Sequence, residues 1–188
     1  HLYRRRQRQM CIRDSLRGCQ FFRSIFREIA ESYPKIGAKE AYIDAFTMWL
    51  VRDPEDLDVV VLPNMFGDIA TDLASVLQGG MGMAASANLG DKHMMFEPVH
   101  GSSPKHAGKN RVNPIAMLSS LQLMLENLSL RHDDPLLDKY GNILQQAISQ
   151  HLSSDGPKTY DIGGTGTTSE VGDAIADRVR RLLRNDKA

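Results

Sequence analysis

Two aspartates stand four residues apart in a stretch that holds no lysine or arginine. The stretch is "NMFGDIATDLASVLQGGMGM", residues 64–83, and the aspartates are Asp68 and Asp72. Side chains four apart on a helix lie about one turn from each other, and like charges there destabilise it by roughly a few tenths of a kcal/mol. Mg2+ or Mn2+, which prefers oxygen ligands, would remove that repulsion. The spacing alone also allows a solvated polar face with Asp68 near the helix N-terminus, where the dipole favours an acid.

A second polar cluster follows in "FEPVHGSSPKHAGKNRVNP", residues 96–114. The segment is too polar for a core and too rich in glycine and proline for a regular element. Backbone N–H groups, small hydroxyls and amides in such a loop suit phosphates and a base. The segment lacks the G-x-G-x-x-G pattern of a dinucleotide-binding turn, so by itself it predicts a binding loop for an unidentified ligand.

Regular elements must position both clusters. Phe22, Ile25, Phe26 and Ile29 have helical spacing and predict a core-packing helix from Leu16 that ends before Pro34. Residues 41–51 predict a short strand or turn and then a helix. Residues 57–64, "LDVVVLPN", predict a buried parallel strand that leads at once into the helix with the aspartates.

Three helices are expected in the second half. Asn113 as N-cap and Pro114 at the first position begin a buried helix that is apolar almost all round. Residues 135–152 predict an amphipathic helix, and a capping box from Thr167 to Glu170 begins the last one. The glycine-rich stretches 79–90 and 163–166 are expected to be loops, the first at a boundary between lobes.

Composition limits the class of protein. The 188 residues are 41% hydrophobic and 24% charged, enough for one domain or two small lobes of a soluble, cytoplasmic protein. The longest apolar runs are too short to span a bilayer, and Cys11 and Cys19 lack metal-ligand spacing. Residues 1–15 carry five arginines and one aspartate, a net charge of +4, and we expect them to be a non-native tail without function.

The two polar clusters together resemble signatures of one enzyme family. Asn64 to Met83 matches N-[MLF]-F-G-D-I-x-[ST]-D followed by Gly-Gly-x-Gly, and Glu97 to Pro114 matches EPVHGS-x-P-x-x-AGK through NP. The chain therefore resembles, over about residues 16–188, the C-terminal half of the metal-dependent, NAD(P)-linked decarboxylating dehydrogenases of isocitrate, 3-isopropylmalate, homoisocitrate and tartrate or malate.

The resemblance implies an α/β, isopropylmalate dehydrogenase-like two-lobe fold, truncated so that it lacks the N-terminal half. Residues 16–80 would end the dimerising second lobe, and residues 81–188 would be the returning part of the cofactor-binding lobe. It further implies a homodimer with shared active sites. Asp68 and Asp72 would bind Mg2+ or Mn2+ in one subunit, with Asp44 reaching the site of the partner.

The resemblance also implies a bound NAD or NADP and a small 2-hydroxy acid substrate. The implied cofactor-binding residues are Glu97, His100, Gly101, Ser102, Ser103, Lys105, His106, Asn113, Tyr160 and Asp161. Lys105, His106 and Tyr160 resemble the 2′-phosphate contacts of NADP-linked members, whereas Gly164 stands where those members have an arginine. The expectation is therefore a modest preference for NADP. "DIGGTGTTSEVGDAI", residues 161–175, resembles the branch acting on isopropylmalate or tartrate.

Departures from the family pattern affect the expected activity. The slot of the catalytic lysine holds Ile12, and the catalytic tyrosine and the substrate-binding serine and arginines are absent, so no catalytic residue is assigned and we expect little turnover from this chain alone. One alternative is a non-catalytic regulatory subunit, which the presence of all three aspartates opposes. Another is a basic-tailed nucleic-acid-binding module, which the net charge of −4 over residues 16–188 opposes. His93, His132 and His151 lack ligand partners at suitable spacing and are expected at the surface.

Overall fold

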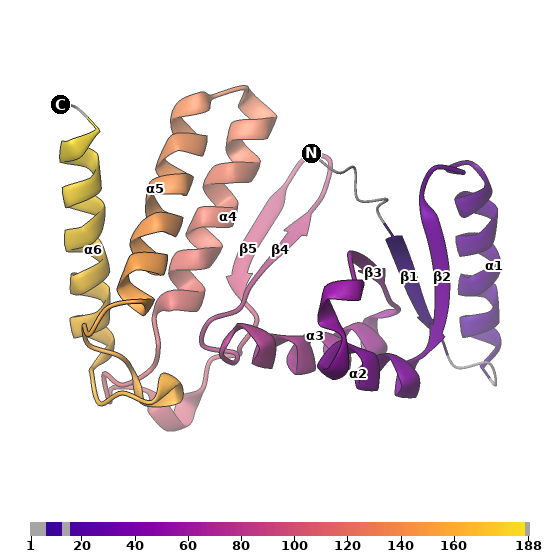
Figure 1. The fold of residues 1–188 in the computed structure, drawn as a ribbon, viewed down its shortest axis with the longest axis horizontal. Coiled ribbons are helices and arrows are strands. Elements are labelled where there is room, and N and C mark those ends of the chain that lie inside the picture. Colours follow the sequence, from indigo (N-terminus) through magenta and orange to yellow (C-terminus); the bar gives the residue numbers. More distant parts are fainter. Residues whose placement is uncertain (1–6, 13–15, 187–188) are drawn as a thin grey trace. The chain divides into compact units, whose positions relative to one another are not determined.

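The computed structural model describes residues 7–12 and 16–186, which form two compact units (Figure 1). The first unit runs to Leu77 and the second begins at Gln78. The predicted lobe boundary lies near this division, while the assignment of the lobes to dimerisation and cofactor binding stays a prediction. In the described part of the chain, no helix combines the length and the apolar character that a membrane crossing requires.

The first unit contains a three-stranded parallel sheet with helices in the connections. The strands are β1 (Gln7–Ile12), β2 (Gly37–Tyr42) and β3 (Val59–Val61), in the order β2-β1-β3. Helix α1 (Arg17–Glu31) connects β1 to β2, and α2 (Ile43–Arg52) with a short 3-10 turn (Pro54–Asp56) connects β2 to β3. Strand β1 lies within the segment expected to be a non-native tail, and the origin of that segment stays a prediction.

Helix α3 (Asn64–Ser75) starts directly after β3 and leads into a 3-10 turn (Val76–Gln78). It packs with α2 around a core of Ala41, Phe46, Leu50 and Ala70. The predicted helix before Pro34, the strand-to-helix segment at 41–51 and the strand that leads into the aspartate-bearing helix are all confirmed.

Burial in the first unit is lower than the sequence predicts. Val59 and Val61 are 44% and 38% exposed, so the expectation of a buried strand is wrong for β3. Ile25 and Ile29 of α1 are also exposed, and they line an apolar cavity of about 430 Å³ together with β3. The described residues therefore leave the space between α1 and β3 unfilled.

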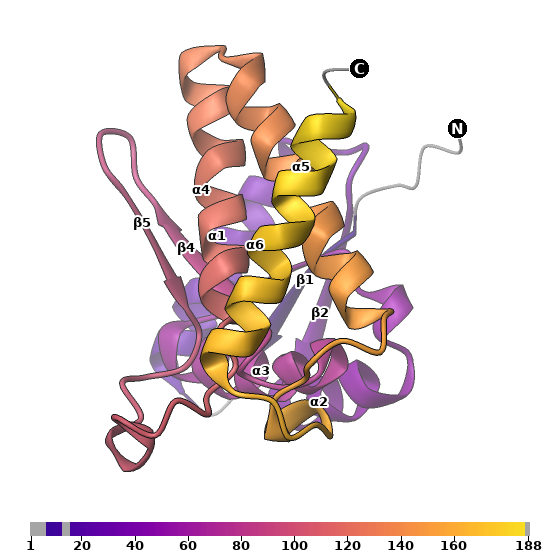
Figure 2. The same cartoon turned by 90° about the vertical axis from the view of Figure 1, so that its left-hand side faces the viewer.

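The second unit combines an antiparallel hairpin with three long helices (Figure 2). The hairpin strands are β4 (Ala85–Leu89) and β5 (Met94–Pro98), so the expectation of a loop over 79–90 is wrong in part. The helices are α4 (Ile115–His132), α5 (Pro135–Leu152) and α6 (Thr168–Asn185), with α5 between the other two. Short 3-10 turns lie at Pro104–His106 and Tyr160–Ile162.

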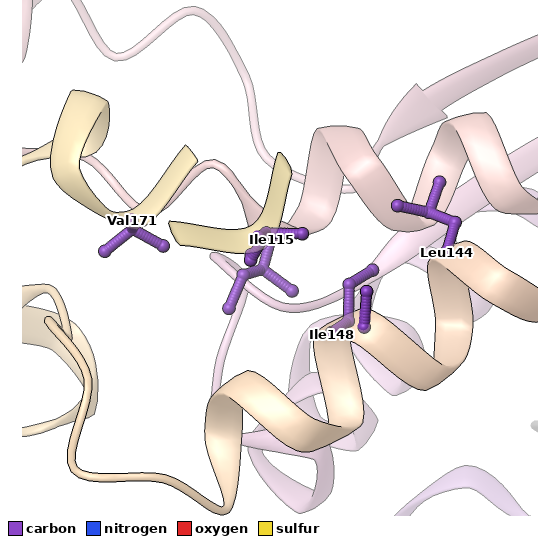
Figure 3. Packing of buried hydrophobic residues seen from close by; sticks show 6 residues of the cluster. Ile115, Leu144, Ile148 and Val171 are labelled. Atoms are coloured by element: carbon purple, nitrogen blue, oxygen red, sulfur yellow. The ribbon is translucent and has the colours of Figure 1, made fainter. Parts of the chain in front are cut away.

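The core of the second unit lies among these helices (Figure 3). Its buried members are Ile115, Leu144, Ala147, Ile148, Val171 and Ile175. The bounds of α5 and the capping box of α6 are confirmed: the Glu170 side chain accepts from Thr167 N at 2.8 Å, and Glu170 N donates to Thr167 Oγ1 at 3.3 Å.

Helix α4 corrects two expectations. Asn113 stands one residue before the N-cap, which is Pro114, although its Oδ1 still accepts from Ile115 N at 3.0 Å. The helix is buried on one side only, since Met117 and Leu130 are 58% and 84% exposed. Because apolar residues lie on all sides of α4, the sequence did not indicate which side of the helix would be buried.

Candidate functional site

The predicted metal ligands Asp68 and Asp72 lie on exposed turns of α3. Pro63 is extended (φ −61°, ψ 152°) and its carbonyl accepts from Gly67 N at 2.8 Å, so the helix starts at once after the strand. The first turn holds no acid and Asp68 lies in the second turn, where the dipole effect has fallen off. Neither carboxylate has a hydrogen-bonding or ionic partner among the described residues. Free carboxylate oxygens one turn apart are a donor set that fits a hard divalent cation.

Asp44 lies apart from them in the first turn of α2, where the helix dipole favours its charge. It is exposed, and its Oδ1 accepts from Ala45 N at 2.8 Å. In the part of the chain that the structure describes, no three His, Cys, Asp or Glu side chains are grouped to hold a metal ion. One copy therefore does not unite Asp44 with Asp68 and Asp72, and the role of Asp44 in the partner's site stays a prediction.

A pocket of about 260 Å³ in the second unit collects five of the predicted cofactor-binding residues. These five are His100, Ser103, Asn113, Tyr160 and Asp161. They come from the loop after β5, the segment just before α4 and the 3-10 turn before α6. Met81, Gly82 and Val112 complete the lining.

Asn113 links the pocket to the helix that follows it. The side chain is buried at 6% exposure; its Nδ2 donates to Asp161 Oδ2 at 3.0 Å while its Oδ1 holds the first turn of α4. A Cβ at Gly82 would lie 2.6 Å from Asp161 Oδ2 and 3.0 Å from the Cβ of Asn113. Glycine at position 82 is therefore what allows the amide and the carboxylate to meet at the pocket wall.

Tyr160, which lines the pocket, lies against the side chains of His106 and Arg111. Its ring stacks on His106 with the centroids 5.8 Å apart, and the guanidinium carbon of Arg111 lies 4.2 Å from its ring centroid. Lys105 precedes His106 in the same 3-10 turn and is exposed. Among the described residues, no carboxylate pairs with Lys105 or Arg111.

Arg111 is a residue that the sequence analysis missed. Its position is fixed by the start of α6, because Thr168 N donates to the Asn110 carbonyl at 3.0 Å and Thr168 Oγ1 donates to the Val112 carbonyl at 2.5 Å. Asn110 takes a left-handed conformation (φ 48°), which asparagine tolerates better than most residues. The sequence signal that could have indicated Arg111 was a second cationic residue in the same loop as Lys105.

Five predicted cofactor-binding residues do not line this pocket, and two of them, Lys105 and His106, lie in the 3-10 turn described above. Glu97 lies on β5, where its Oε1 accepts from Asn88 Nδ2 at 3.3 Å across the hairpin. Gly101 and Ser102 are exposed in the loop after β5. Their roles toward a cofactor stay predictions.

His151 lies where the sequence analysis did not expect it. It is 0% exposed at the C-terminal end of α5, so the expectation of a surface histidine is wrong. Burial lowers the pKa of His151, with the positive charges of Arg178 and Lys158 adding to the effect and the Pro157 backbone opposing it.

Comparison with known proteins identifies the family to which this geometry corresponds. The model of the isocitrate/isopropylmalate dehydrogenase family matches residues 12–175. A 3-isopropylmalate/3-methylmalate dehydrogenase of Methanocaldococcus jannaschii is 43% identical over 159 residues, which cover 85% of this chain and 45% of that protein. A probable tartrate dehydrogenase/decarboxylase of Bacillus subtilis is 41% identical over 165 residues, covering 86% and 44%.

The fold agrees with solved structures of the same kind. Isocitrate dehydrogenase from Methylococcus capsulatus aligns with a TM-score of 0.85 at 34% identity, over 94% of this chain and 51% of that one. The predicted fold class is thereby confirmed. The chain spans about half the length of the relatives it matches.

Proposed function

The chain belongs to the isocitrate/isopropylmalate dehydrogenase family, and we propose that the full-length protein is an NAD(P)-dependent oxidative decarboxylase of a small 2-hydroxy acid that requires Mg2+ or Mn2+. The observation that carries the proposal is the pocket in which five of the predicted cofactor-binding residues converge from three separate elements. These residues come from segments that lie 10 to 61 positions apart in the sequence, and their convergence on one pocket supports a binding role.

Asp68 and Asp72 are the proposed metal ligands, and Asp44 of a second copy is the proposed further ligand in a homodimer with shared sites. Their support is exposure, the absence of partners in the described residues and the one-turn spacing on α3. When bound, such a cation supplies Lewis-acid polarisation of a hydroxyl and a carboxylate oxygen. The aspartates supply the negative oxygens, and their mutual repulsion falls once a cation lies between them.

The pocket of the second unit is the proposed site for the adenosine part of the cofactor. Asn113 and Asp161 present an amide and a carboxylate at the wall, and Tyr160 offers a planar ring at the rim. Glu97 is proposed at the nicotinamide end. The residues His100 to Ser103 are proposed along the ribose and phosphates, where backbone N–H groups of a short loop suit anionic oxygens.

NADP is the proposed preferred cofactor, by a modest margin. His106 and Arg111 bring an ionisable and a cationic group to Tyr160, and Lys105 precedes His106 in the same turn. Neither Lys105 nor Arg111 has a carboxylate partner in the described part of the chain. A phosphate on the ribose would therefore meet uncompensated positive charge. Asp161 opposes this attraction, although Asn113 already satisfies one of its oxygens.

Isopropylmalate and tartrate are the proposed substrate types to test first, with isocitrate and malate as competitors. The full-length protein, with its upstream sequence restored, should be assayed for NAD(P)H formation and CO2 release with each acid in the presence of Mn2+. We expect metal-dependent reduction of the cofactor with at least one of them. Metal and cofactor binding without turnover on any of the acids would instead favour a regulatory subunit.

A further inference from the structure

His151 lies in the last turn of α5 in an unusual environment. The side chain is 0% exposed, and neither ring nitrogen has a partner in hydrogen-bonding geometry among the described residues. The hydroxyl of Thr159 nearby in sequence is also fully buried and without a partner there. An imidazole in such a place is much more stable uncharged than charged, because a buried charge needs a partner of opposite sign.

The charged side chains that act on the His151 ring are both positive, and the Pro157 backbone opposes their effect on the pKa of the ring. Arg178 of α6 donates from a terminal guanidinium nitrogen to Ser154 Oγ at 2.7 Å, and Ser154 Oγ itself donates to the His151 carbonyl at 2.8 Å. Lys158 acts on the ring from the segment that follows α5, whereas Asp155 in the same turn is exposed. A proton on the ring would therefore add a third positive charge.

The same ring packs against the segment that carries the pocket residues. A Cβ at Gly156 would lie 3.4 Å from Cε1 of His151, so the backbone there passes close to the imidazole. The segment then folds back on itself: Gly166 N donates to the Lys158 carbonyl at 2.7 Å and Gly164 N to the Thr159 carbonyl at 3.0 Å. Between these two bonds stand Tyr160 and Asp161, which line the pocket.

We propose that His151 is a positioning residue: its uncharged ring supports segment 156–166 and so holds Tyr160 and Asp161 at the pocket, and a proton on the ring releases the segment. Burial beside two cations lowers the pKa of His151, so the ring stays uncharged at neutral pH and takes up a proton only on acidification below its usual range. The inference does not depend on which ligand the pocket takes.

Amide hydrogen exchange on the full chain tests the proposal without any ligand. The amides of Gly164 and Gly166 report the folded-back segment, and amides in the middle of α5 serve as the reference. After correction for intrinsic rates, we expect protection of the two glycines to fall at least about tenfold relative to α5 between pH 7.5 and pH 5. We expect His151→Leu to keep its protection at both pH values and the exposed-histidine control His132→Gln to behave as the wild type.

Two results would overturn the proposal: wild-type protection that does not change with pH, or the same pH dependence in His151→Leu. If His151→Leu does not fold, an NMR titration of the His151 ring in the wild type replaces it. A ring midpoint below 6.5 that matches the midpoint of the Gly164 and Gly166 amide shifts supports the proposal. A midpoint at or above 6.5, or unmatched glycine shifts, contradicts it.

Discussion

Asp72 is the residue at which the proposed metal chemistry can be tested most directly. In the restored full-length dimer we expect Asp72→Asn to lower kcat/KM about a hundredfold or more, roughly 2.7 kcal/mol, because an amide cannot supply a negative oxygen to the cation. The side chain is exposed and has no partner in the described chain, so the midpoint of thermal unfolding without metal should stay within about 2 °C. Steady-state kinetics with Mn2+ and a thermal melt are the two measurements.

The exposed Asp173 of α6 provides the control for that substitution. Asp173→Asn removes the same charge from another helix and should leave kcat/KM unchanged. If Asp72→Asn kept wild-type activity with Mn2+, the assignment of the metal site to α3 would be wrong.

Lys105 and Arg111 belong to a separate residue-scale prediction about the cofactor. Arg111 offers a cation over the Tyr160 ring, and Lys105 offers one in the turn that carries His106. Both residues are exposed, and one such charge contributes on the order of 1 kcal/mol or less toward a phosphate. We expect Arg111→Ala to lower the ratio of kcat/KM for NADP over NAD about fivefold, and Lys105→Asp to lower it further. Initial rates with both cofactors at one fixed salt concentration measure the ratio.

Lys109 lies in the same loop and is exposed, so Lys109→Ala is the matched control and should change the ratio little. A wild-type preference for NAD above about a hundredfold, roughly 2.7 kcal/mol, would contradict the assignment of this loop to a phosphate.

At the scale of elements, Glu40 ties helix α1 to strand β2. Arg27 Nε donates to its Oε1 at 2.5 Å and Arg23 Nε to its Oε2 at 2.7 Å. Hydrogen bonds from Arg27 lower the pKa of Glu40, helped by Arg23 and opposed by burial. The unfolded chain then binds more protons than the folded chain once the pH drops, so this stabilisation is complete above about pH 5 and is lost on further acidification.

We therefore expect Glu40→Gln to lower the free energy of unfolding by about 1 kcal/mol at pH 7 and by much less at pH 3. Urea unfolding at the two pH values measures the difference. Asp177→Asn breaks an exposed pair with Arg180 and should have almost no effect at either pH. An equal loss for Glu40→Gln at both pH values would mean that packing, and not charge, links α1 to β2.

Elements could be predicted from the sequence where local chemistry decides them. The Pro34 stop, the bounds of α5 and the capping box at Thr167 depend on neighbours a few residues away, and all three are confirmed. Strand β4 was missed because Ala, Ser and Asn have weak strand preference, and its pairing with β5 supplies what propensity does not. The contact between Arg111 and Tyr160 was missed because the two residues are 49 positions apart and no local sequence pattern joins them.

For the whole molecule, the hydrophobic cores are confined to separate units. The core of the second unit draws only on residues 83–182, whereas the two smaller clusters of the first unit draw on residues 19–74. Trp49, the single tryptophan, packs against the first-unit core, while the three longest helices belong to the second unit. Tryptophan fluorescence and far-UV circular dichroism therefore report mainly on different units.

We expect the two signals to give different midpoints in urea, with fluorescence changing first, because the first unit has the smaller core and the more exposed apolar side chains. The thermal transition measured by calorimetry should likewise have a van't Hoff enthalpy below the calorimetric one. Coincident curves by both probes would show that the units unfold as one cooperative body.

Strand β3 has a consequence for how copies of the chain behave toward one another. It lies at one edge of the described sheet, and it consists of three valines of which two are exposed. Its residues are β-branched and include no charge or proline, so the unpaired backbone groups at this edge offer a template for a strand from another chain. Self-association at this edge should therefore compete with refolding, and the yield of native protein should fall as the chain is refolded at higher concentration.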